Sequence, residues 1–91
     1  MDKLFECREK IDRIDSEIIR LYEERMKVVK DVAEYKIANH MEVLDASREK
    51  AMLEKNLGKV KESKLKPYYH HVLSGFLLAS REMQKDILEK K

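Results

Sequence analysis

The stretch EERMKVVKDVAEYK, residues 23–36, belongs to a helical pattern that one charged residue interrupts. Steps of three and four residues trace an apolar seam along one helix face: Leu4, Cys7, Ile11, Ile14, Ile18, Leu21, Arg25, Val28, Val32 and Tyr35. Arg25 occupies a seam position, where a charge loses its hydration unless an anionic group meets it. That group is either an Asp or Glu of the protein or an anionic ligand.

The composition favours a single helical domain covering residues 1–91. Charged residues make up 42% of the chain and hydrophobic residues 43%, with only two glycines and one proline. Acidic and basic residues are interleaved and the formal net charge is +2. A nucleic-acid binder would gather its basic residues on one face, so we expect no nucleic-acid partner and a solvated surface for most Lys and Glu residues.

The chain carries no signal for a membrane, a metal or an exported protein. No apolar run approaches the ~18 residues of a membrane span, and the N-terminal MDKLFECREK is too charged for a signal peptide. No ligand spacing for a metal is present. The single cysteine, Cys7, lies on the seam and is expected to pack in the core. We therefore expect a cytoplasmic protein without membrane association.

Three helices are predicted: a long one from Leu4 to Ile37, a short one from Ala46 to Leu57, and a medium one ending near Glu89. Asp45 is the expected N-cap of the second helix and Gly58 its expected stop, while Pro67 fits the first turn of the third. The first helix would be ~50 Å long. A domain of ~100 residues has a radius of gyration of only ~13 Å, so a second copy should cover the overhang as a twofold homodimer.

Polar residues also interrupt the apolar stripe of the third helix. Ser80 and Gln84 are one turn apart, between Phe76 and Ile87. Taken alone, such residues are most often satisfied by the backbone or by water.

Lys36 follows Arg25 by eleven residues, which returns a helix to within ~20° of the same face. The two cations therefore flank the apolar patch of Val28, Val29 and Val32, and their long side chains could converge on one small anion. The simpler alternative is that Lys36 extends to solvent near the helix C-terminus, where the dipole favours a cation.

Arg8 precedes Arg25 by seventeen residues, or ~25 Å along a helix, so both cannot reach one small ligand within a chain. Two first helices paired antiparallel about residues 16 and 17 would bring Arg8 of one copy beside Arg25 of the other. Otherwise Arg8 is a surface residue. Asp45, Arg48 and Glu49 either serve only the start of the second helix or, with its free N–H groups, hold a ligand hydroxyl.

Three segments together resemble the all-helical class of chorismate mutase: REKIDRIDSEIIRLYEERMKVVKDVAEYK, VLDASREKAMLE and SREMQ. The resemblance implies an intertwined helical homodimer that converts chorismate to prephenate in phenylalanine and tyrosine biosynthesis, by a unimolecular rearrangement without a cofactor. It implies that Arg25 binds one carboxylate of chorismate, and that Arg8 of the other subunit reaches toward the second.

The resemblance assigns the remaining residues as well. Lys36 and Gln84 would donate hydrogen bonds to the ether oxygen, and Lys36 would also assist in binding a carboxylate. Glu49 would accept a hydrogen bond from the ring hydroxyl, near the backbone of Asp45. Two residues would complete the carboxylate contacts: Arg48 and Ser80.

One departure from the family pattern is Glu42, which stands where a proline often precedes the second helix and so bears on the rigidity of that loop. We expect a monofunctional enzyme without a regulatory domain in this chain. An isochorismate-pyruvate lyase is the enzymatic alternative, and a helical dimerisation module is the non-enzymatic one.

Overall fold

The computed structural model describes residues 2–90 as an all-α chain. It contains α1 (Lys3–Ala38), α2 (Ala46–Lys59), a short 3-10 turn (Ser63–Leu65) and α3 (Lys66–Glu89). The predicted all-α class and the long, short and medium helices are confirmed, and each predicted helix end agrees with the structure to about two residues. Within these residues, no helix combines the length and apolar character needed to cross a membrane.

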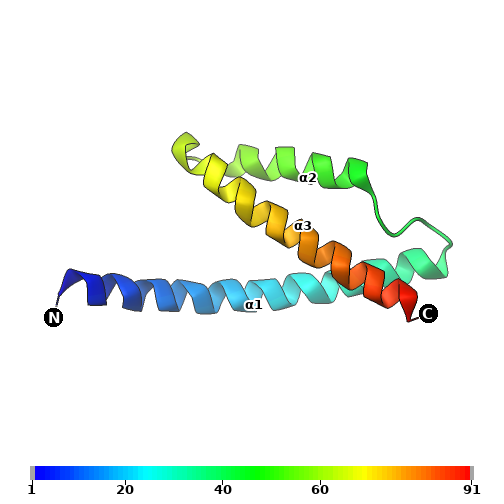
Figure 1. The fold of residues 1–91 in the computed structure, drawn as a ribbon, viewed down its shortest axis with the longest axis horizontal. Coiled ribbons are helices and arrows are strands. Elements are labelled where there is room, and N and C mark those ends of the chain that lie inside the picture. The colour runs from blue at the N-terminus through cyan, green and yellow to red at the C-terminus, as the bar shows by residue number, and fades with distance from the viewer. Residues whose placement is uncertain (1, 91) are drawn as a thin grey trace.

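Helix α1 is the longest element and sets the shape of the chain, which measures 57 × 27 × 15 Å. Its start is capped by Asp2, whose carboxylate accepts a hydrogen bond from the Phe5 amide at 2.8 Å. No glycine or proline interrupts the 36 residues that follow. The N-terminal part of α1 extends beyond the ends of α2 and α3 (Figure 1).

The N-terminal half of α1 has an apolar seam that stays exposed within the chain. The side chains of Leu4, Ile11, Ile14 and Ile18 are 49–57% exposed. Cys7 is exposed as well, so the prediction that it packs in the core of the chain is wrong. The sequence pattern indicates correctly that this face is apolar, but neither α2 nor α3 folds back far enough to cover it.

Helix α3 holds the other two helices together. It packs against α1 along one part of its length and against α2 along another, whereas no Cα atom of α1 lies within 8 Å of one in α2. The buried apolar side chains are Ala33 on α1, Val43 in the segment between α1 and α2, Met52 on α2, and Leu73 and Leu77 on α3. Four partly buried side chains surround the core of α2 and α3: Leu53, Leu57, Tyr69 and Phe76.

The end of α2 differs from the sequence prediction. Gly58 lies inside the helix, which continues to Lys59 and is followed by Val60 in an extended conformation. The Val60 amide donates to the Leu57 carbonyl at 3.2 Å, and this bond closes the last turn without a left-handed glycine. Pro67 does lie in the first turn of α3, as predicted.

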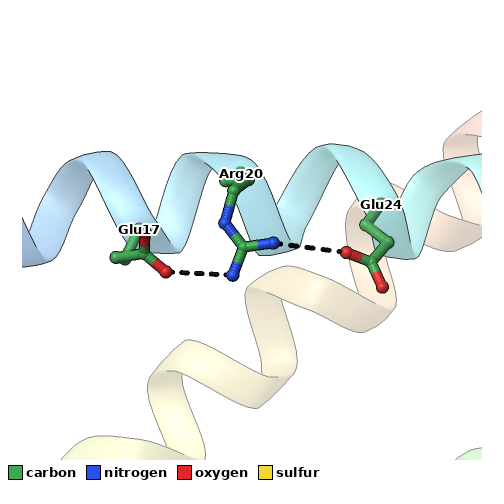
Figure 2. A network of polar contacts seen from close by, with 3 residues as sticks. All are labelled: Glu17, Arg20 and Glu24. Atoms are coloured by element: carbon green, nitrogen blue, oxygen red, sulfur yellow. Dashed lines mark hydrogen bonds and ion pairs between the residues drawn. The ribbon is translucent and has the colours of Figure 1, made fainter.

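Charged side chains on the exposed face of α1 pair with one another. Arg20 bridges Glu17 at 2.9 Å and Glu24 at 3.6 Å (Figure 2). All three side chains are more than half exposed, so each pair contributes only ~0.3–0.5 kcal/mol. Such pairs at spacings of three and four residues are ordinary for an exposed arginine on a helix. Arg25 differs, because it forms no ion pair within residues 2–90.

A histidine directly after the C-cap of α1 has a left-handed conformation. His40 has φ 57°, a value that usually belongs to glycine or asparagine at this point of a helix. Its amide donates to the Ile37 carbonyl at 3.2 Å, and the Met41 amide donates to the Lys36 carbonyl at 2.8 Å. These are the two bonds of a Schellman motif, so the motif fixes the backbone conformation despite the side chain.

We expect His40→Gly to raise the free energy of unfolding by about 1 kcal/mol, because glycine adopts this conformation without the steric penalty of a Cβ atom. Chemical denaturation at one fixed protein concentration measures the effect. His40→Ala is the control, since it removes the imidazole but keeps the Cβ atom. An equal gain in both variants would contradict the backbone explanation.

Candidate active site

A cavity of about 300 Å³ lies where the C-terminal half of α1, the start of α2 and the C-terminal half of α3 meet. Its apolar wall includes Val28, Val29 and Val32, the patch that the sequence places between Arg25 and Lys36. Its polar lining comprises every site residue that the sequence predicts except Arg8: Arg25, Lys36, Asp45, Arg48, Glu49, Ser80 and Gln84. Residues from three separate helices are thus gathered around one space.

Arg25 is held by neutral groups. Its Nη1 donates a hydrogen bond of 2.7 Å to the Ser80 hydroxyl on α3. Its guanidinium carbon lies 5.5 Å from the centre of the Phe76 ring, within the range of a cation–π contact. Both contacts fix the position of the guanidinium, and neither supplies a negative charge.

Lys36 lies at the other end of the valine patch and is half-buried. Its Nζ donates a long hydrogen bond of 3.4 Å to the carbonyl of Val43, in the loop between α1 and α2. The ammonium therefore stays at the cavity and does not extend into solvent, which contradicts the simpler alternative for this residue.

The start of α2 supplies acidic residues that are already engaged. Asp45 caps the helix as predicted, since its carboxylate accepts from the Arg48 amide at 3.1 Å. The Glu49 carboxylate lies 3.7 Å from Nη1 of Arg81 on α3. Each acidic side chain in the cavity wall thus has a donor or cation of its own.

Ser80 and Gln84 face the cavity from α3. Ser80 is only 7% exposed, and its hydroxyl contacts the Arg25 side chain, not the backbone or water partner that such residues usually have. The amide nitrogen of Gln84 donates to the Ser80 carbonyl at 3.2 Å, so the backbone does satisfy this second side chain. A ligand acceptor could receive the second N–H of the same amide, because a glutamine amide carries two N–H groups.

The distribution of charge around the cavity is uneven. Among residues 2–90, no carboxylate oxygen lies within 4.0 Å of a side-chain nitrogen of Arg25, Lys36 or Arg48. Arg20, only five residues before Arg25, pairs with two carboxylates. The cavity thus presents cations that residues 2–90 leave without an anionic partner.

Arg8 lies outside this cavity, on the exposed N-terminal part of α1. Its part in a shared site stays a prediction. The sequence reasoning gave no role to Arg81, although this residue stands directly after Ser80 in SREMQ, and it did not foresee the Val43 carbonyl as the acceptor for Lys36. In the part of the chain described here, no cluster of three or more His, Cys, Asp or Glu residues is arranged to hold a metal ion.

The family model for chorismate mutase type II matches residues 7–85 of the chain. The chain belongs to this family. The matched range includes every residue of the polar lining, so the family relation covers the cavity as well as the fold.

Several chorismate mutases are similar to the chain in sequence. A bifunctional chorismate mutase/prephenate dehydratase of Buchnera aphidicola subsp. Acyrthosiphon pisum is 36% identical over 84 residues, which are 91% of this chain and 22% of that protein. The one from Aquifex aeolicus is 42% identical over 68% of the chain and 17% of its own length. A chorismate mutase of Methanocaldococcus jannaschii is 46% identical over 55% of the chain and 50% of its own length.

The chain thus spans about a fifth or less of the bifunctional relatives and half of the Methanocaldococcus jannaschii chorismate mutase. No solved structure gives a significant match to the chain.

We expect Ser80→Ala to lower the free energy of unfolding of this chorismate mutase family member by about 1–2 kcal/mol, because a charged donor loses a largely buried acceptor. Ser74→Ala is the matched control. Ser74 lies on the same helix, is exposed, and only donates to the His70 carbonyl. Both changes gain the same helix propensity, so their difference in thermal or chemical denaturation isolates the Arg25 contact. Equal stabilities of the two variants would contradict this assignment.

Proposed function

We propose that the chain is a chorismate mutase, which converts chorismate to prephenate by a unimolecular Claisen rearrangement. One observation carries the proposal: Arg25, Lys36 and Arg48 line one cavity without any carboxylate partner from the described chain. An anion with more than one charge fits such a wall, and chorismate carries two carboxylates. Membership of the chorismate mutase type II family supports the same substrate.

The reaction requires the substrate to be held folded, since a C–C bond forms between its two ends while a C–O bond breaks. Cations fixed at separate points of the cavity would hold the carboxylates so that the reacting carbons meet. The apolar wall of Val28, Val29 and Val32 would cover the ring and exclude water. No proton is transferred, so the protein needs no general acid or base.

Negative charge grows on the ether oxygen as the C–O bond stretches, and we assign its stabilisation to Lys36 and Gln84. Both side chains line the cavity and donate only to neutral backbone carbonyls, at 3.4 Å and 3.2 Å. An oxygen that gains charge is a stronger acceptor than those carbonyls, so the donors should shift to it as the reaction proceeds. Both donors belong to residues that line the cavity, so only their side chains would have to turn.

Glu49 and Arg48 are assigned to the remaining groups of the substrate. The Glu49 carboxylate would accept a hydrogen bond from the ring hydroxyl, while Arg48 would contact a substrate carboxylate, with Ser80 positioning Arg25 opposite. The Asp45 carboxylate caps α2, so its backbone would take part in this region and its side chain would not.

The proposal includes a homodimer with shared sites. The seam of α1 is exposed over its N-terminal half, and apolar surface of this kind is favourably covered by another chain. An antiparallel pair of α1 helices about residues 16 and 17 would cover it and place Arg8 of each copy near Arg25 of its partner. Arg8 would then supply the charge opposite the second carboxylate.

The cavity argues against the non-enzymatic alternative but does not by itself separate the two enzymatic reactions. A helical dimerisation module would gain nothing from cations that have no carboxylate partner within residues 2–90. An Arg25–carboxylate pair in a closed core would favour such a module, whereas Arg25 donates to the Ser80 hydroxyl. An isochorismate-pyruvate lyase would use a similar cavity for its dianionic substrate, so the assay must separate the two reactions.

We expect purified protein to consume chorismate and form prephenate, and Lys36→Ala and Arg25→Ala each to lower kcat/KM about a hundredfold or more. The assay follows the ultraviolet absorbance of chorismate and identifies the product. Lys27→Ala is the matched control, because Lys27 is exposed and nine residues before Lys36, on the opposite face of α1.

Circular dichroism should show all three variants folded. Isochorismate is supplied in a parallel reaction, and formation of salicylate and pyruvate without any prephenate from chorismate would favour the lyase. Wild-type kcat/KM in Lys36→Ala or Arg25→Ala would contradict the roles assigned to those residues.

We expect a mixture of Arg8→Ala and Arg25→Ala chains to recover activity after subunit exchange, although each variant alone is nearly inactive. Random exchange makes about half of the dimers mixed, and each mixed dimer carries one intact site, so about a quarter of the wild-type activity should return. Exchange is verified by mass spectrometry of differently tagged chains. Mixed dimers without recovered activity would contradict the shared site.

A further inference from the structure

An ion pair at the rim of the cavity has no role in the proposed function. Nη1 of Arg81 lies 3.7 Å from Oε1 of Glu49 and so joins α3 to the first turn of α2. Arg81 does not line the cavity, whereas Glu49 does. The Arg81 side chain is 46% exposed and that of Glu49 is 24% exposed, so the cation sits on the solvent side of the pair.

The Glu49 carboxylate creates a problem for a site that binds an anion. It lines the same cavity as Arg25, Lys36 and Arg48, and a carboxylate in such a place is attracted to any of them. A Glu49 side chain turned onto one of these cations would compete with a substrate carboxylate. In the structure it does not do so, because its closest cation is Arg81.

We propose that Arg81 is a positioning residue for substrate binding, which holds the Glu49 carboxylate away from the cavity cations. This inference rests on the proposed function. The pair engages Oε1 and thereby leaves Oε2 as an acceptor for the ring hydroxyl of the substrate. Arg81 acts through Glu49 and does not touch the substrate.

The position of Arg81 on α3 fits this role. Arg81 directly follows Ser80, whose hydroxyl accepts a hydrogen bond from Arg25. One turn of α3 therefore contacts both the Arg25 guanidinium and the Glu49 carboxylate. A pair that is half exposed contributes little to the folding of a protein. Loss of this ion pair should therefore change the orientation of the Glu49 carboxylate more than it changes the free energy of unfolding of the chain.

The test is a double-mutant cycle of Arg81→Gln and Glu49→Gln, with KM and kcat for chorismate measured separately. We expect Arg81→Gln to raise KM about threefold to fivefold with a smaller change in kcat, because a released Glu49 competes for the cations. In the Glu49→Gln background the same change should leave KM unaltered. Arg81→Lys keeps the charge and should restore most of the wild-type KM.

Lys85→Gln is the matched control, since Lys85 is exposed on α3 one turn after Arg81 and its loss changes the net charge equally. It should leave KM within about twofold, as expected for a surface change. The positioning role is overturned if Lys85→Gln raises KM as much as Arg81→Gln, if the rise persists without the Glu49 charge, or if Arg81→Gln has no effect. A wild-type chain that does not convert chorismate overturns the proposed function itself, and the two failures are thereby distinguished.

Discussion

The hydrogen bond from Arg25 to Ser80 is the contact on which the site depends. It joins α1 to α3 across 55 residues of sequence, and its length of 2.7 Å is that of a strong bond to a charged donor. A carboxylate in place of the hydroxyl would hold the guanidinium equally well but would also neutralise it. The serine therefore fixes the cation and preserves its charge for a ligand.

A similar separation of cations from carboxylates is found for other residues that line the cavity. Arg25 contacts a hydroxyl and an aromatic ring and Lys36 a backbone carbonyl, whereas the carboxylates of Asp45 and Glu49 contact a helix amide and Arg81, which lies outside the cavity lining. Charges that are fixed before the ligand arrives stabilise it without a further loss of side-chain freedom. This arrangement explains how a chain of three helices with a small core can still present an ordered site.

Much of the fold could be predicted from the sequence because its signals are local. Asp45 caps α2 and Pro67 opens α3 through contacts within one turn, and the apolar periodicity of α1 continues without a breaker. Arg25, Ser80 and Gln84 were detectable as polar residues on apolar stripes.

Other features depend on tertiary structure and leave no such pattern. The partner of Arg81 lies on another helix, and the acceptor for Lys36 is a backbone carbonyl that any residue could supply. The exposure of Cys7 follows from where the chain turns back, which the apolar pattern does not specify. The family match covers residues 7–85, and only the contacts separate residues that line the cavity from those, such as Arg81, that lie beside it.

The absence of close backbone contact between α1 and α2 has a mechanical consequence. Within residues 2–90, these helices are connected through α3 and through the segment of residues 39–45, so the width of the cavity follows the tilt of α3. A molecule that contacts both Lys36 on α1 and Glu49 on α2 would add a direct link between two helices whose backbones are not in close contact. Binding of such a molecule in the cavity should then slow amide hydrogen exchange along α2, including at residues that the molecule does not contact.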